Sequence, residues 1–75
     1  MANQVRAETN VYRITPDDDR QLLRRSINGT QWSYVTGVNG YHILDLLLAP
    51  NGHDIEVYTD HGVYLREYSG CIRKK

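Results

Sequence analysis

The amino-acid sequence predicts a small α+β domain, in which an antiparallel meander of four to five strands carries one helix on one face. Apolar and polar residues alternate over several short stretches, as in half-buried strands. Asn-Gly or His-Gly pairs recur about every 10–12 residues, a spacing typical of consecutive short strands. One segment also carries a strong helix-start signal. The alternative fold is an all-β small barrel or sandwich.

The helix is predicted at residues 16–27. Thr15 suits the N-cap, Pro16 the first helical position and the following aspartates the first turn, and Asn28-Gly29 marks the end. A helix here would align Leu22, Leu23 and Ile27 in one apolar stripe. The alternative is a turn at residues 16–19 followed by a strand at 21–27.

Five stretches are predicted to be strands, the first of them short: residues 11–14, 30–37, 41–49, 54–59 and 63–69. The loop at 38–40 would pair strand 30–37 with strand 41–49. The Asn51-Gly52 loop would place Leu46 opposite Val57 and Leu48 opposite Ile55. The last hairpin is expected to have the three-residue loop Asp60-His61-Gly62, because this register pairs Glu56 with Arg66 and Tyr58 with Tyr64.

These registers divide the side chains between two faces of the sheet. The helix is expected to cover the more apolar face, which carries Trp32, Tyr34, Leu44, Leu46, Leu48, Ile55, Val57, Val63 and Leu65. The opposite face would be unusually apolar and aromatic for an exposed surface, and tyrosine and arginine are enriched at interface hot spots. We therefore predict a partner-binding face, unless the sheet curls and buries it. Its predicted binding residues are Tyr41, Ile43, Glu56, Tyr58, Tyr64 and Arg66.

The functional expectation is a non-enzymatic binding module that acts as a regulator or inhibitor through protein contacts, as a homodimer. The alternative is a nucleic-acid-binding accessory protein. The cations of that alternative are Arg20, Arg24, Arg25, Arg73, Lys74 and Lys75. Nine basic and nine acidic residues give zero net charge, which argues against a domain that is basic throughout.

Catalytic, metal and cofactor sites are not predicted. Each of the three histidines, His42, His53 and His61, has an aspartate nearby in the sequence, but they belong to different turns and no nucleophile motif accompanies them.

The 75 residues are expected to form one domain, with flexible ends at 1–10 and 72–75. Cys71 is the single cysteine, which favours a reduced, cytoplasmic setting. No membrane span is predicted.

Overall fold

The computed structural model describes residues 4–75 as eight antiparallel strands with no helix, so the predicted α+β class is wrong. The strands are β1 (Gln4–Ala7), β2 (Asn10–Ile14), β3 (Leu22–Ser26), β4 (Ser33–Val35), β5 (Ile43–Leu48), β6 (Ile55–Thr59), β7 (Gly62–Arg66) and β8 (Ile72–Lys74). None of the described residues therefore forms a helix that could span a membrane. Residues 1–3, part of the predicted flexible end, lie outside the described residues.

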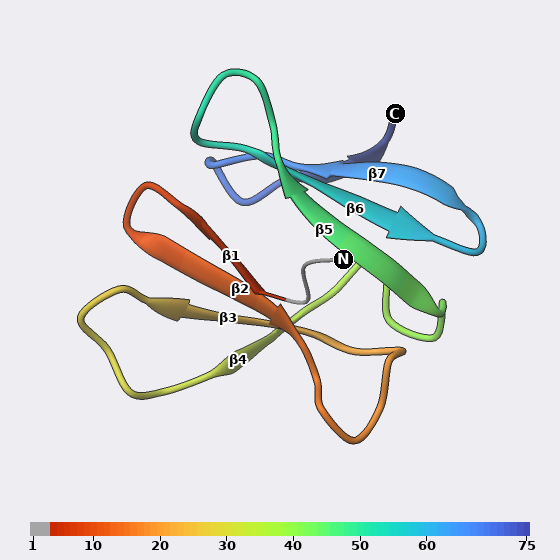
Figure 1. Ribbon diagram of the computed structural model, residues 1–75, viewed down its shortest axis with the longest axis horizontal. Coiled ribbons are helices and arrows are strands. Elements are labelled where there is room, and N and C mark those ends of the chain that lie inside the picture. Colours follow the sequence, from red (N-terminus) through yellow and green to blue (C-terminus); the bar gives the residue numbers. More distant parts are fainter. Residues whose placement is uncertain (1–3) are drawn as a thin grey trace.

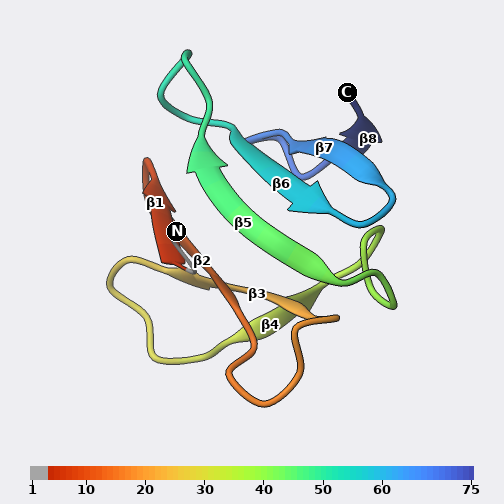
Figure 2. The ribbon, with the colours of Figure 1, turned by 45° about the vertical axis from the view of Figure 1, so that its right-hand side comes forward.

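Two four-stranded meanders make up the fold, sheet A in the order β1-β2-β3-β4 and sheet B in the order β5-β6-β7-β8 (Figure 1). Strand β5 runs beside β1, where the two sheets approach each other (Figure 2). The hydrophobic core draws on both sheets and on their connection; its buried members are Ala7, Tyr12, Leu22, Val35, Val38, Ile43, Leu46, Ile55 and Val57.

The segment predicted as a helix forms a turn followed by strand β3. The amide of Asp18 donates to the carbonyl of Thr15 at 3.2 Å, which places Pro16 at the second position of a β-turn. Proline followed by aspartate suits that turn as well as it suits a helix start, so the local signal is ambiguous. Burial resolves it: Leu22 is fully buried in the core, whereas its neighbour Leu23 is buried on the opposite face of sheet A. The leucine doublet thus reflects a strand covered on both sides.

The predicted hairpin between residues 30–37 and 41–49 is also wrong, because β4 pairs with β3 and β5 begins the other sheet. The connection between them crosses from one sheet to the other and contributes the fully buried Val38. It approaches β8 so closely at Gly37 that a Cβ atom there would lie 2.3 Å from Cγ2 of Ile72.

Sheet B confirms one predicted register and corrects the other. Leu46 lies opposite Val57 and Leu48 opposite Ile55, as predicted. In the next hairpin, however, Val57 pairs with Tyr64, so the loop is Asp60-His61. The register of β7 therefore differs from the predicted one by one residue, which exchanges the two faces of this strand. Tyr64 therefore packs against the core, while Val63 and Leu65 point outward.

The charge argument for the three-residue loop failed because the partner of Glu56 comes from the C-terminal segment. Residues 72–74 form β8, and the following residue, Lys75, makes an ion pair with Glu56 from the far side of β7. The carboxylate is therefore neutralised without the predicted pairing of Glu56 with Arg66.

Candidate functional site

The six residues predicted to bind a partner do not share one exposed face. Ile43 is only 3% exposed and belongs to the core, and Tyr41 and Tyr64 pack against that core with their rings 5.8 Å apart. Arg66 is on the inner side of sheet B, where its Nε donates to the hydroxyl of Tyr12 at 3.4 Å. The remaining two, Glu56 and Tyr58, lie on the outer face.

That outer face of sheet B, here called the Glu56 face, comprises Leu47, Glu56, Tyr58, Val63 and Leu65, with the charged Asp45 opposite Tyr58, Arg73 opposite Leu65 and Lys75 at its edge. The Tyr58 hydroxyl donates to Glu56 Oε1 at 3.0 Å, and Lys75 Nζ donates to Oε2. These hydrogen bonds, first from Lys75 and then from Tyr58, lower the pKa of Glu56, and the same contacts raise the pKa values of Tyr58 and Lys75. The face thus combines apolar side chains with charged ones, and Glu56 is neutralised by its contact with Lys75.

The cations predicted to contact nucleic acid are likewise dispersed. Arg24 is on the inner face of sheet A, where it donates to Oδ1 of Asn10 at 2.7 Å. In the C-terminal segment, Arg73 pairs with Glu67 at 3.6 Å and Lys75 with Glu56. Two further members of the set, Arg20 and Lys74, are exposed on different parts of the chain. Arg25 alone lies on a surface with other cations and aromatic rings.

That surface is the outer face of sheet A, here called the Arg–Trp face, which comprises Arg6, Arg13, Arg25, Trp32 and Tyr34. Period-two alternation places them together: Arg6 and Arg25 flank Val11, and Arg13 and Tyr34 flank Leu23. Trp32 directly precedes β4, and two guanidinium groups contact its ring. The guanidinium carbon of Arg13 is 4.2 Å from the ring centroid and that of Arg25 is 5.0 Å away. Both distances are within the range of cation–π attraction.

The Arg–Trp face stays partly apolar beneath its charges. Val11 and Leu23 are 3% and 8% exposed although they point away from the core. We infer that Trp32 and the aliphatic stems of Arg13 and Arg25 cover them, because all five side chains are on the same side of the sheet. Tyr34, in contrast, is 69% exposed and is the most exposed of the large hydrophobic residues.

The electrostatics of the Arg–Trp face are one-sided. Within residues 4–75, no carboxylate lies within ion-pairing distance of Arg6, Arg13 or Arg25, and none of the outward strand residues of sheet A is acidic. Arg25 donates to three backbone carbonyls of the following loop, while the buried Nε of Arg13 has no hydrogen-bond partner. Such a face favours anionic groups that accept hydrogen bonds.

The sequence-based prediction did not include Arg6, Arg13, Trp32 or Tyr34 in a site. It placed both aromatic residues under the predicted helix, as part of the core. One feature of the sequence could have indicated this face, namely the alternative strand at residues 21–27. Alternation along that strand puts Leu23 and Arg25 on one side of the sheet. Recognising the site also requires the pairing of β2, β3 and β4, which the residues do not specify locally.

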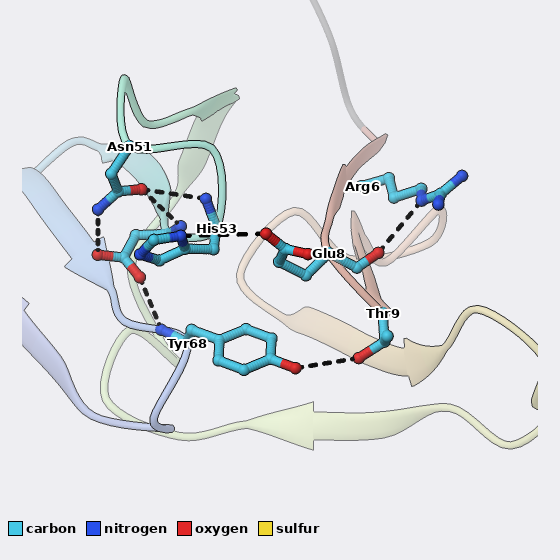
Figure 3. Close-up of polar contacts among 7 residues, drawn as sticks. Arg6, Glu8, Thr9, Asn51, His53 and Tyr68 are labelled. Atoms are coloured by element: carbon cyan, nitrogen blue, oxygen red, sulfur yellow. Dashed lines mark hydrogen bonds and ion pairs between the residues drawn. The ribbon is translucent and has the colours of Figure 1, made fainter.

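Two of the three histidines lie at one place, because the backbone amide of His42 donates at 3.1 Å to Oδ1 of Asp60, the same atom that the His61 ring contacts. His42 contacts Asp19 at 3.1 Å and His61 contacts Asp60 at 2.8 Å. His53 lies 4.0 Å from Glu8 at a junction where turns from both sheets meet (Figure 3). Across the described part of the chain, no three histidine, cysteine or acidic side chains are grouped as metal ligands would be.

The junction of Figure 3 ties the two sheets together. The Tyr68 hydroxyl lies 3.3 Å from Oγ1 of Thr9, and the Tyr68 amide donates to Asp54 at 2.8 Å. Asp54 also accepts a hydrogen bond from the Asn51 amide, and these contacts lower the pKa of its carboxyl. The contacts are those expected of a structural joint between turns.

No family model, curated protein or solved structure matches the chain. The candidate site therefore rests on geometry and chemistry, and the Arg–Trp face is the surface with the most specific chemistry.

Proposed function

We propose that this chain is a non-enzymatic nucleic-acid-binding module that holds the sugar–phosphate backbone on the Arg–Trp face. The observation that carries the proposal is that Arg13 and Arg25 both contact the ring of Trp32, on a face whose outward strand residues include no carboxylate. Phosphate oxygens are anionic hydrogen-bond acceptors, and arginine binds them with planar, forked donors.

Asp19, which follows the turn at residues 15–18, makes its contacts toward sheet B. The carboxylate of Asp19 contacts His42, and its backbone carbonyl accepts from Ile43 at the start of β5. Zero net charge is thus compatible with a local cationic face, since it is the local potential at the binding face that attracts phosphates.

The test measures the binding of a fluorescently labelled oligonucleotide of about 15 nucleotides. Fluorescence anisotropy gives the affinity at several salt concentrations. If Arg6, Arg13 and Arg25 each contact one phosphate of a single strand, a plot of the logarithm of the binding constant against the logarithm of the salt concentration should have a slope of about −2. Arg13→Gln should make the slope shallower by about 0.7. Arg73→Gln is the matched control, because Arg73 is paired with Glu67 on the other sheet, and it should leave the slope unchanged. An affinity independent of salt would refute the proposal.

A second candidate function is the predicted protein-binding regulator or inhibitor, now on the Glu56 face rather than on the six residues named from the sequence. The observation that favours it is the partly exposed apolar surface there, with Leu47 44% exposed beside Val63 and Leu65. Its occupant would be a second copy of this chain, as in the predicted homodimer. Leu47→Asp should then convert a dimer into a monomer in sedimentation at several concentrations; a wild-type chain that sediments as a monomer at every concentration refutes this second candidate. The predicted cytoplasmic setting is retained as part of both proposals.

A further inference from the structure

We infer that the ligand of the Arg–Trp face is single-stranded rather than duplex nucleic acid, with an unpaired base stacked on Tyr34. This inference rests on the proposed function, since it names the form of nucleic acid that the same face would take. It follows from the position of the aromatic and guanidinium planes on the face.

The ring of Tyr34 is exposed and can stack on a base. At 69% exposure it is the most exposed large hydrophobic side chain of the described chain, and it points outward from edge strand β4. Burying this ring against another planar group would be favourable, because exposed aromatic surface gains from removal from water. In a duplex the base faces are already stacked on each other. A single strand, by contrast, offers free base faces to an aromatic side chain.

A row of side chains crosses sheet A from Arg13 to Tyr34. Arg13, Leu23 and Tyr34 are directly opposite one another on β2, β3 and β4, so the backbones that carry the cation and the aromatic ring are about 10 Å apart across two strand spacings. A backbone that crosses the sheet along this row would place a phosphate at Arg13 and a base at Tyr34. Cationic groups that follow the backbone, together with aromatic stacking platforms, are the combination found in single-strand binders.

We assign Trp32 a supporting role, which is to position the two guanidinium groups. Its ring is already engaged by Arg13 at 4.2 Å and by Arg25 at 5.0 Å, and it is only partly exposed. It therefore holds the two guanidinium groups in place rather than offering a free face to a base. Because it is the single tryptophan of the chain, its emission also reports directly on ligand binding at this face.

The experiment compares three probes at one salt concentration: an oligothymidine single strand, the same strand paired with its complement, and polyglutamate as an acidic polypeptide. We expect the single strand to bind at least about tenfold more tightly than the duplex. Tyr34→Ala should weaken single-strand binding by about tenfold to a hundredfold, and Tyr34→Phe should retain it, because stacking needs the ring and not the hydroxyl. Tyr68→Ala removes another exposed tyrosine, 48% exposed in the β7–β8 turn, and should leave binding unchanged.

Each outcome is decisive. Equal affinity for duplex and single strand overturns this inference while the proposed function stands, and no affinity for either overturns both. Equal or tighter binding of polyglutamate indicates an acidic protein partner and overturns both. Unchanged binding by Tyr34→Ala overturns the stacking role. Because Tyr34 is so exposed, its variants should keep the wild-type circular dichroism spectrum and urea midpoint, so a loss of binding reflects the face itself.

Discussion

Replacing Gly37 by alanine tests the closest approach between the inter-sheet connection and sheet B. Gly37 has φ +106, a conformation that side-chain-bearing residues rarely adopt, and its added Cβ would lie 2.3 Å from Cγ2 of Ile72. Two separate costs therefore act at one position. One is backbone strain and the other is a steric clash that forces β8 or the connection to move.

Their magnitudes can be estimated separately. A residue with a Cβ in this region of backbone space costs about 1–3 kcal/mol. Insertion of a methyl group into a filled space costs a further 1–3 kcal/mol or so. We therefore expect Gly37→Ala to lower the free energy of unfolding by about 2–6 kcal/mol, a large share of the roughly 5–10 kcal/mol of a small domain.

The matched control is Gly40→Ala. Gly40 also has a positive φ, +95, but nothing lies within 4 Å of its added Cβ, so that variant carries the backbone cost alone. The measurement is urea unfolding followed by far-ultraviolet circular dichroism. In a double-mutant cycle, Ile72→Ala should recover about 1–3 kcal/mol of the loss in Gly37→Ala, because it removes the clashing methyl group. Equal losses in both glycine variants, with additive behaviour of the double mutant, would refute the described packing of Gly37 on β8.

Three further predictions concern stability. Leu46→Ala should lower the free energy of unfolding by about 2–5 kcal/mol, because Leu46 is fully buried. Leu47→Ala should change it by less than about 1 kcal/mol, because Leu47 is 44% exposed. Similar losses for the two variants in urea unfolding would contradict the assignment of Leu46 to the inner and Leu47 to the outer face of β5. Acidification should destabilise the chain. The pKa of Glu56 is lowered in the folded state, so its contribution is complete above the ordinary value near 4.5 and disappears as pH falls through the folded value. Glu56→Gln should flatten this part of the stability profile, measured by thermal unfolding at several pH values; a profile as steep as that of the wild type would show that other groups cause the loss. Asp54→Asn should flatten the acid limb in the same assay, since the pKa of Asp54 is lowered by hydrogen bonds from Asn51 and Tyr68; an unchanged limb would argue against those contacts.

The sequence determined much of sheet B. The position of Asn51-Gly52 and the alternation of flanking apolar residues were enough to predict the pairs Leu46–Val57 and Leu48–Ile55, although the β-turn itself spans Ala49 to Gly52, whose amide donates to the Ala49 carbonyl at 2.9 Å. This succeeded because a short turn fixes the register of its own hairpin, so neighbouring residues contain the information. Residues 11–14 were also predicted to be a strand, and they lie within β2.

Only the tertiary structure decided the rest, because the competing local states were close in free energy. Thr15-Pro16-Asp17 suits a turn or a helix start, and burial of Leu22 and Leu23 on opposite faces selected the strand. Long-range contacts also oriented β7, since the partner of Glu56 is Lys75, 19 residues away. The Arg–Trp face depends on pairing among β2, β3 and β4. The contact of two guanidinium groups with one tryptophan therefore forms only when distant strands assemble, and no local pattern of residues encodes it.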